Sequence, residues 1–342
     1  MNDSNEHIFA NRQTLIVSMA EIKELMPMDE CIELQKQVFA AHVQGGAQNA
    51  PNTWLRVTGQ NKWMKLLAGY VADIDTMGMK VLARFPENPP GMNIGSLVAL
   101  FDGSDGFPIA IMDAVYFTAV RTAAGGGLSA LYCARKDATS VGIVGSGVQA
   151  RYNLIAMKQL LPQLSDARVY SRSEERRESF AEKMQQETGI QMVAVGTVEE
   201  AVEGMEIILM GTNSPQPVLL KEMVVPGVHI AAMGIKTEIE PSVFKGARVI
   251  GDGRQVTMED GKFSVGFEAG VLSESDLAGE EIFEIGDVVI GKIQGRLSDT
   301  DVTIFDSSGL AVQDVICAHY CYKKAKKVGK GTWVDLGLGE LP

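Results

Sequence analysis

The stretch Val141–Ala150, VGIVGSGVQA in one-letter code, decides the fold. It begins as an apolar strand, breaks into the pattern Gly-x-Gly-x-x-Ala and continues into residues with helical spacing. Gly145 would permit a tight turn, Gly147 would let the backbone approach a pyrophosphate, and Ala150 would let the helix pack closely on the strand. A second strand-like run, Ala167–Tyr170, follows at the distance that a βαβ unit needs. The stretch therefore predicts the first turn of a dinucleotide-binding unit; the alternative is a tight strand-to-helix turn that binds no nucleotide.

The composition favours a soluble globular protein. The 342 residues are 46% hydrophobic, which is enough for a large core and for two domains or one domain with an insertion. The formal net charge of -12 argues against nucleic acid as a partner. No apolar stretch reaches the roughly 18 residues that span a bilayer, and the N-terminus lacks a basic segment followed by an apolar one. We therefore expect no membrane association and a cytoplasmic location.

The four cysteines, Cys31, Cys133, Cys317 and Cys321, are dispersed along the chain. Cys317 and Cys321 lie one helical turn apart, a spacing that could bind a metal ion but that lacks partner ligands. We expect reduced thiols with a structural role and no metal site.

The part of the chain before the glycine-rich stretch combines helices with consecutive strands. A helical pattern over Met19–His42 is interrupted at Pro27. Strand-like runs follow without an intervening helix, at Trp54–Val57, Trp63–Val71, Met77–Phe85 and Ser96–Phe101. They predict an antiparallel or mixed sheet, and a helix over about Ala114–Ala134 then leads into the glycine-rich stretch.

The part after the stretch alternates strands and helices. Further strands are predicted at Gln191–Ala194, Ile207–Gly211, His229–Ala232, Val249–Gly251 and Asp301–Phe305, with helical pieces at Val198–Val202 and Pro241–Phe244. This alternation predicts a Rossmann-type, doubly wound parallel sheet with helices on both faces. A final helix over Leu310–Lys327 is expected to return to the first part of the chain. The fold class is thus α/β, with a smaller α+β domain beside the parallel sheet.

The end of the second strand bears on the choice of cofactor. An acidic side chain is usual there when the cofactor is NAD, whereas this chain reads Tyr170-Ser171-Arg172-Ser173. A guanidinium with neighbouring hydroxyls could bind the 2′-phosphate of NADP, so we favour NADP(H), with NAD(H) possible. Alternatively, Arg172 lies flat on the adenine and the pocket accepts either cofactor. Arg176 either reinforces the phosphate site or is a surface charge.

Several polar residues near strand ends have competing interpretations. Thr212 and Asn213 follow an apolar strand, where they would contact the nicotinamide ribose or simply form a turn. His229 is expected to be a structural hydrogen-bonding residue rather than an acid. Asp252 and Asp314 are expected to cap or pair with other groups.

Several further motifs occur in a fixed order. They are Met77–Val81, Leu100–Asp102, Arg121–Ala124, Gly211–Ser214, Pro226–His229 and Phe305 with Ser308–Asp314. With the glycine-rich stretch they resemble the ornithine cyclodeaminase and mu-crystallin family over almost the whole chain. The resemblance implies a homodimer, with a nicotinamide cofactor acting on a carbon that bears nitrogen, usually next to a carboxylate.

The same resemblance implies two domains and a site between them. Residues 1–121 with 310–342 would form the substrate-binding and dimerisation domain, and residues 122–309 the dinucleotide-binding domain. Ser308 and Gly309 resemble the segment that touches the nicotinamide ring. The cofactor-binding set is Thr122, Gly145, Ser146, Gly147, Val148, Gln149, Ala150, Ser171, Arg172, Ser173, Arg176, Thr212, Asn213, Met233, Ser308 and Gly309.

Three basic residues match the positions that bind the substrate α-carboxylate in the family: Arg56, Lys80 and Arg121. A guanidinium fork and a neighbouring ammonium suit a carboxylate beside a hydride acceptor. Lys80, between the two arginines, is expected to release its proton readily and is the candidate catalytic residue. Each of the three could instead be structural, Arg56 as an exposed strand residue.

The chain departs from the family after Ala232-Met233-Gly234, where it reads Gly234–Ile239 and lacks a loop aspartate. In ornithine cyclodeaminase that carboxylate is thought to handle the side-chain amine, so its absence counts against cyclodeamination. Lys236 or Glu238 could replace it.

The function predicted from the sequence is that of an NAD(P)H-dependent oxidoreductase acting on small imino acids. It would be an imine reductase that also works in reverse as an amino-acid dehydrogenase, with Lys80 or a water supplying the proton. The alternatives are ornithine cyclodeaminase, which forms proline and ammonia, and a protein that binds NADP and a carboxylate ligand without turnover.

Overall fold

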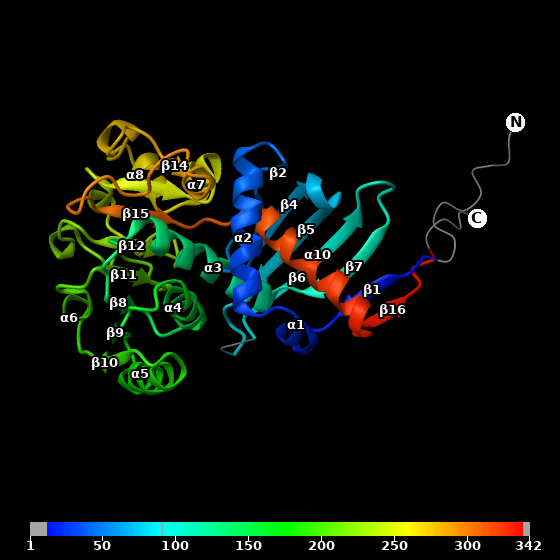
Figure 1. The fold of residues 1–342 in the computed structure, drawn as a ribbon, viewed down its shortest axis with the longest axis horizontal. Coiled ribbons are helices and arrows are strands. Elements are labelled where there is room, and N and C mark those ends of the chain that lie inside the picture. Colours follow the sequence, from blue (N-terminus) through cyan, green and yellow to red (C-terminus); the bar gives the residue numbers. More distant parts are fainter. Residues whose placement is uncertain (1–11, 90–91, 338–342) are drawn as a thin grey trace, which may run out of the picture. The chain divides into compact units, whose positions relative to one another are not determined.

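The computed structural model describes residues 12–89 and 92–337, which fold into two compact units (Figure 1). Unit 1 comprises residues 1–34, 44–118 and 310–342, and unit 2 comprises residues 35–43 and 119–309. Each unit has its own sheet, sheet A in unit 1 and sheet B in unit 2. The N-terminal segment used to predict the location, residues 1–11, lies outside the described residues.

Sheet B is parallel throughout, as the alternation of strands and helices predicts. Its strand order is β10-β9-β8-β11-β12-β15-β13-β14. The strands are β8 (Ser140–Val144), β9 (Asp166–Tyr170), β10 (Gln191–Ala194), β11 (Ile207–Met210), β12 (His229–Ala232), β13 (Arg248–Gly251), β14 (Phe283–Glu284) and β15 (Thr303–Asp306). The central strands β11 and β12 are buried at every position, because helices cover both faces of such a sheet.

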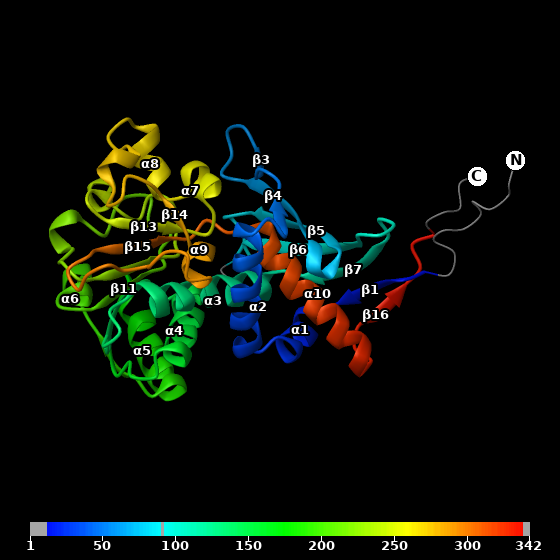
Figure 2. The same ribbon diagram turned by 45° about the horizontal axis from the view of Figure 1, so that its top comes forward.

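The helices of unit 2 pack on sheet B, and α4 and α5 lie side by side (Figure 2). They are the later part of α3 (Val115–Cys133), then α4 (Val148–Leu160), α5 (Glu174–Thr188), α6 (Val198–Val202), α7 (Arg254–Asp260), α8 (Phe263–Glu268) and α9 (Ile285–Val289), with 3-10 turns at Lys221–Met223, Pro241–Phe244 and Glu274–Asp276. Glycines let α3 approach α4 closely. A Cβ on Gly126 would clash with Asn153 Oδ1, and one on Gly127 would lie 3.0 Å from Ala156 Cβ.

Sheet A is mixed, because β1 pairs with β7 in parallel while its other pairs are antiparallel. The strand order is β16-β1-β7-β6-β5-β4-β2, and β3 also pairs with β4. The strands are β1 (Thr14–Val17), β2 (Ala47–Asn49), β3 (Thr53–Arg56), β4 (Trp63–Val71), β5 (Thr76–Arg84), β6 (Ile94–Asp102), β7 (Pro108–Asp113) and β16 (Thr332–Val334). The strand-like sequence runs correspond to β3, β4, β5 and β6, whereas β1, β2, β7 and β16 were not predicted.

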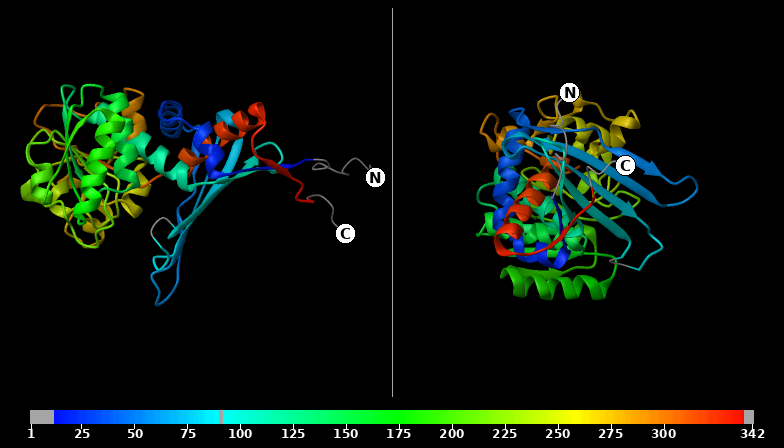
Figure 3. Two further views of the ribbon diagram at one scale, coloured as in Figure 1. Left: turned by 90° about the horizontal axis from the view of Figure 1, so that it is seen from below. Right: turned by 90° about the vertical axis from the view of Figure 1, so that its right-hand side faces the viewer.

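One face of sheet A carries α10 (Ala311–Val328), which Figure 3 shows on one side of the strands. Gly69 of β4 and Gly78 of β5 permit this close packing. A Cβ on Gly69 would lie 2.8 Å from Val312 Cγ1, and one on Gly78 would lie 2.7 Å from Val315 Cγ2. The side chains that alternate with these glycines point to the opposite face of the sheet.

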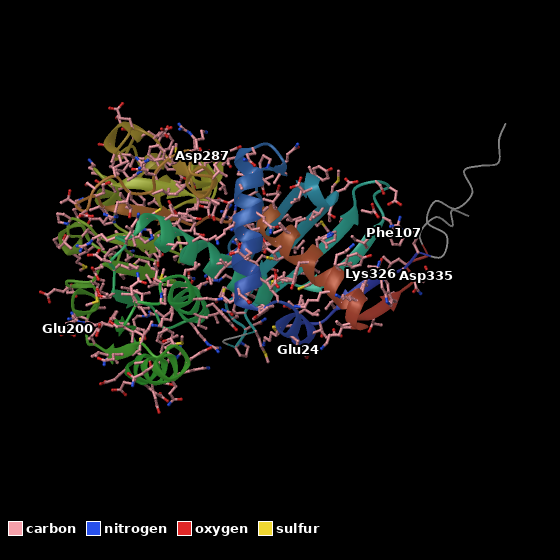
Figure 4. The ribbon with its side chains drawn as sticks, in the orientation of Figure 1. Glu24, Phe107, Glu200, Asp287, Lys326 and Asp335 are labelled. Carbon is pink, nitrogen blue, oxygen red and sulfur yellow. The ribbon has the colours of Figure 1, made fainter. Side chains whose placement is uncertain are left out.

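The N-terminal helical pattern is split near Pro27, as predicted, into α1 (Met19–Leu25) and α2 (Met28–Val43). Ser18 caps α1, and a 3-10 turn at Ala72–Ile74 joins β4 to β5. At the other end of α1, Glu24 projects from the helix (Figure 4) and pairs with Lys330, which follows α10.

All four cysteines are buried, and none of them forms a disulfide within the described residues. Cys31 Sγ lies 3.8 Å from Cys317 Sγ. Burial raises the pKa of the Cys133 thiol to about 12, which keeps it protonated and unreactive at neutral pH. No helix within residues 12–89 and 92–337 is long and apolar enough to cross a bilayer.

Candidate functional site

The turn between β8 and α4 has the backbone that the glycine pattern predicts. Gly145 adopts φ 111°, and a Cβ there would lie 2.5 Å from the carbonyl oxygen of Gly211, so only glycine fits. At Gly147 the backbone does not require glycine, because its φ is −95° and a Cβ there would have no other atom within 4 Å. Gly147 is also the N-cap of α4 and offers no side-chain cap to the first turn. No side chain caps the first turn of α4, and its backbone N–H groups suit an anion such as a pyrophosphate.

The segment after β9 is organised by serine hydroxyls. Ser146 Oγ donates to Ser171 Oγ (2.9 Å), and Ser173 Oγ accepts from the Arg176 backbone N–H, which caps α5. Arg172 and Arg176 are both exposed. Within the described part of the chain, no hydrogen bond or ion pair of the Arg172 side chain is found.

The ends of β11 and β12 are joined by the buried carboxylate of Glu238. Its Oε2 accepts from Thr212 N (2.8 Å) and Thr212 Oγ1 (2.9 Å), and its Oε1 accepts from Gly234 N (2.7 Å). Burial raises the pKa of the Glu238 carboxyl above its usual value, although these bonds and the nearby Lys262 act in the opposite direction. Lys236 is engaged too, because its Nζ donates to the Glu259 carbonyl oxygen (2.8 Å) and to Ser264 Oγ (3.0 Å). Both candidates for the role of the absent loop aspartate therefore hold local structure.

Other members of the predicted cofactor set differ in exposure. Val148, at the start of α4, is 61% exposed, and Asn213 is exposed after β11. Gln149 is half-buried, whereas Ala150 is fully buried against the sheet. Thr122 and Met233 are buried, and Met233 Cε would lie 2.9 Å from a Cβ on Gly126.

The segment Ser308–Gly309 lies beside Arg121 in unit 2. The backbone N–H groups of Ser308 and Gly309 donate to Asp252 Oδ2 (2.6 and 2.8 Å), so Asp252 caps this segment as predicted. Gly309 adopts φ 81°, and a Cβ there would lie 2.9 Å from Arg121 Nη1. The structure thus places the Arg121 guanidinium against the segment that is predicted to touch the nicotinamide.

Sequence reasoning missed a buried ion pair at the end of β15. The Asp306 carboxylate accepts from the backbone N–H groups of Lys262 and Phe263 and lies 3.6 Å from Lys262 Nζ. Lys262 Nζ also donates to the Ser307 carbonyl oxygen (2.7 Å). Asp306 ends an apolar strand and is followed by polar residues, a pattern from which a buried carboxylate could have been predicted. No sequence pattern marked Lys262 as the partner of Asp306, because Lys262 precedes a short helix far from Asp306 in the sequence.

His229 is structural, as predicted. Its ring nitrogens lie 3.1 Å from Ser129 Oγ and 2.9 Å from Thr303 Oγ1, and the residue is fully buried. Burial lowers the pKa of His229 to about 3, so the ring stays neutral at physiological pH.

Lys80 forms a buried ion pair in unit 1. Its Nζ lies 2.7 Å from Asp314 Oδ2 and 3.4 Å from Thr118 Oγ1, and the Lys80 and Asp314 side chains are 2% and 0% exposed. Lys80 shares the α10 face of β5 with Gly78, which is why it meets the first turn of α10. Asp314 thus pairs with another group, as expected, and sequence reasoning did not identify Lys80 as its partner.

Arg56 lies at the end of β3 and is exposed, with its Cζ 4.6 Å from the centre of the Trp54 ring. The register pairs Arg56 with Trp63 and pairs Lys80 with Leu67. Trp63 and Leu67 are separated by an even number of positions on β4, so Arg56 and Lys80 share one face of sheet A. Arg121 belongs to unit 2.

Comparison with known proteins identifies the family of this chain and agrees with its α/β fold. Residues 12–329 match the family described as "Ornithine cyclodeaminase/mu-crystallin family". The chain belongs to this family. The resemblance inferred from the sequence motifs is therefore confirmed, as is the α/β fold class.

Relatives of this chain include enzymes whose solved structures contain a nicotinamide cofactor. Alanine dehydrogenase of Archaeoglobus fulgidus is 33% identical over 327 residues, covering 93% of this chain and 97% of that protein. The structure of Thermococcus litoralis Δ1-pyrroline-2-carboxylate reductase in complex with NADH and L-proline has a TM-score of 0.88 at 29% identity, covering 94% of this chain and all (100%) of that one.

Two more solved structures extend the comparison. An archaeal alanine dehydrogenase dimer with bound NAD has a TM-score of 0.88 at 30% identity, covering 95% of this chain and 100% of that one. The iminosuccinate reductase of Paracoccus denitrificans in complex with NAD+ has a TM-score of 0.85 at 28% identity, with the same coverage of 95% and 100%. Imine reductases and an amino-acid dehydrogenase are thus among the relatives, in agreement with the predicted class of enzyme.

Proposed function

We propose that this protein is an NAD(P)H-dependent reductase of small imino acids that also works in reverse as an amino-acid dehydrogenase. The observation that carries the proposal is the buried Lys80–Asp314 pair, which holds an ammonium group on the same sheet face as Arg56. We assign residues 122–309 to cofactor binding, and residues 1–121 with 310–342 to substrate binding and dimerisation.

The residues of the β8–α4 turn fit a dinucleotide. Gly147 leaves open space where a Cβ would be, and the uncapped first turn of α4 offers amide donors for the pyrophosphate. When bound, the nicotinamide supplies hydride to the carbon of the C=N bond. Gly309, whose backbone lies against Arg121, supports the assignment of the Ser308–Gly309 segment to the nicotinamide ring.

The basic residues would orient the substrate. Arg56, Lys80 and Arg121 bind the carboxylate, and guanidinium groups suit this because they donate two parallel hydrogen bonds. Lys80 carries the proton that the imine nitrogen requires, and its Nζ lies 2.7 Å from Asp314 Oδ2. Reduction then consumes one hydride and one proton and leaves an amino acid.

The direct test follows NADPH and NADH oxidation by absorbance with pyruvate, glyoxylate, oxaloacetate and cyclic imino acids, the acyclic keto acids in the presence of ammonia or methylamine. We expect oxidation with at least one of these substrates. Absence of oxidation across the set would overturn the proposal. Proline release from ornithine would instead identify a cyclodeaminase, against which the engaged Lys236 and Glu238 argue.

For the cofactor we infer a preference for NADP(H). Three similar structures contain NADH, NAD or NAD+, whereas here the turn after β9 presents the exposed Arg172 between two serines. Arg172→Ala should raise the KM for NADPH by roughly 10-fold, because a charge-assisted hydrogen bond contributes about 1.5–3 kcal/mol. The KM for NADH should stay within about twofold. Steady-state kinetics with both cofactors checks this, and an unchanged KM for NADPH would show that Arg172 does not bind the 2′-phosphate.

We also infer a homodimer formed through sheet A. The face opposite α10 exposes Leu55 (58%), Met77 (52%), Met79 (36%) and Leu97 (40%), and a hollow of about 510 Å³ lies beside the two methionines. Exposed apolar patches of this kind mark interaction surfaces. The archaeal alanine dehydrogenase relative is a dimer, which supports the inference.

Replacing both methionines with glutamate should convert the dimer to a monomer, because each protomer would bury two charges at the interface. Light scattering coupled to size exclusion measures the expected twofold drop in mass. Val193→Glu, at a position in unit 2 that is 56% exposed, serves as the control and should leave the mass unchanged. A double variant that keeps the wild-type mass would place the interface elsewhere.

A further inference from the structure

Two neighbouring strands of sheet B end in buried polar groups. β13 and β15 pair in parallel, with Gly251 opposite Asp306, and lie side by side (Figure 2). Asp252 follows β13 directly, and Ser308 lies two positions after β15. The carboxyl ends of parallel strands form the edge of the sheet at which ligands bind. Asp252 and Ser308 therefore lie at the same edge of unit 2 as the glycine turn that follows β8.

The Asp252 carboxylate is buried and only partly hydrogen-bonded. Its Oδ2 accepts from the backbone N–H groups of Ser308 (2.6 Å) and Gly309 (2.8 Å), which are neutral donors and leave the negative charge in place. Among the described residues, Oδ1 has no hydrogen-bond partner, although Asp252 is 1% exposed. Ser308 Oγ is likewise buried without a partner in that part of the chain. Buried polar atoms without a partner are uncommon in folded proteins, and they point to a functional site at this edge.

The cations near Asp252 have other anions to meet. Lys262 Nζ lies 3.6 Å from the Asp306 carboxylate, and no ion pair of Asp252 is found within residues 12–89 and 92–337. Burial raises the pKa of the Asp306 carboxyl, the Lys262 charge and two backbone N–H groups lower it, and the Asp252 charge raises it further. The charge of Asp252 thus acts across the end of β15. Arg121, beside Gly309, is assigned above to the carboxylate of the substrate.

We propose that Asp252 stabilises the oxidised nicotinamide ring, so that this carboxylate strengthens the binding of oxidised cofactor relative to reduced cofactor. The inference rests on the function proposed above, in which the Ser308–Gly309 segment touches the ring. The ring is neutral when reduced and carries one positive charge when oxidised. A buried negative charge attracts the charged form and has little effect on the neutral one.

This role of Asp252 also bears on the direction of the reaction. The hydride takes two electrons to the carbon of the C=N bond, and the imine nitrogen takes the proton, as in the proposed function. Positive charge then develops beside Asp252, at the edge where the carboxylate is already held by two backbone N–H groups. Asp252 therefore favours reduction of the imine over oxidation of the amino acid.

Binding of oxidised and reduced cofactor to the protein tests the proposal. Isothermal titration calorimetry without substrate gives Kd for NADP+ and NADPH, and in parallel for NAD+ and NADH. Asp252→Asn keeps the shape of the side chain and an acceptor oxygen for the segment but removes the charge. It should raise Kd for the oxidised cofactor roughly 10-fold and leave Kd for the reduced cofactor within about twofold. A role only in holding the segment would raise both values by the same factor.

Asp301→Asn is the matched control. Asp301 Oδ2 also accepts from two consecutive backbone N–H groups, those of Leu297 (2.7 Å) and Ser298 (3.0 Å). Asp301 precedes β15, so it lies at the opposite edge of sheet B, and its replacement should leave the ratio of the two Kd values within about twofold. Asp252→Ser also removes the charge, and it takes the place of Asp252→Asn if thermal unfolding shows that Asp252→Asn is not folded.

The outcomes separate this inference from the proposed function. If the wild-type protein binds neither pair of cofactors, the proposed function fails and this inference fails with it. If the cofactor binds and the loss of the Asp252 charge weakens both forms equally, or the reduced form more, the function stands and the role of Asp252 is wrong. An equal change of the ratio in Asp301→Asn would also overturn the inference, because the effect would not come from the cofactor edge.

Discussion

Replacing Lys80 with methionine should lower kcat/KM for imine reduction by roughly 10²–10⁴-fold, the range expected when a positioned acid–base group is removed. Lys80 is the buried ammonium group of the proposed site, and its Nζ lies 2.7 Å from Asp314. Methionine keeps the length and shape of the side chain but cannot bind a carboxylate or carry a proton. Steady-state kinetics with saturating NADPH measures the effect.

The substitution also leaves the Asp314 carboxylate without its ion-pair partner at a site that is 0% exposed. Breaking a buried pair in this way costs about 3–5 kcal/mol of folding free energy. A double variant, Lys80→Met with Asp314→Leu, removes both charges and should recover most of that stability without recovering activity. Activity of Lys80→Met within a few fold of wild type would show that Lys80 acts in structure alone. Recovery of activity in the double variant would show that the single variant was inactive only because it was misfolded.

The helices and strands that could be predicted from the sequence are those with a long hydrophobic pattern formed by neighbouring residues. β4 is predicted at its observed bounds, Trp63–Val71, because its length and flanking turns are visible in the sequence. The missed strands β1 and β16 are short, and they pair with each other across nearly the whole chain. Their stability comes from tertiary pairing, which no local pattern reveals. β7 has apolar residues on both faces and directly precedes α3, so its pattern merges with that of the helix.

In the candidate site, too, local features could be predicted from the sequence and long-range contacts could not. The turn backbone at Gly145 depends on one short segment, so spacing alone predicts it, while contact of Gly147 with a pyrophosphate stays a prediction. The pairing of Lys80 with Asp314 depends on how α10 packs on sheet A, and that depends on Gly69 and Gly78.

The two glycines of the cofactor turn should respond differently to the same substitution. Gly145→Ala should lower the free energy of unfolding by about 1–3 kcal/mol or more, because alanine is strained at φ 111° and its Cβ would lie 2.5 Å from the Gly211 oxygen. Gly147→Ala should leave that free energy within about 1 kcal/mol, since φ is −95° and the Cβ has open space. Both variants should weaken NADPH binding by roughly 10-fold or more, Gly147→Ala because its Cβ would stand where the pyrophosphate approaches. Chemical denaturation and NADPH fluorescence titration measure the two quantities.

Gly95→Ala is the control, because a Cβ at Gly95 of β6 also has nothing within 4 Å and the residue lies in unit 1. It should change neither quantity appreciably. If Gly147→Ala binds NADPH as tightly as wild type, the turn does not hold a pyrophosphate and the cofactor assignment fails. If Gly147→Ala instead loses stability as Gly145→Ala does, the space beside Gly147 is filled by the protein itself. A loss of binding with no loss of stability has one physical source, a ligand group in contact with the backbone at Gly147, because nothing within the folded chain is displaced by the added methyl group.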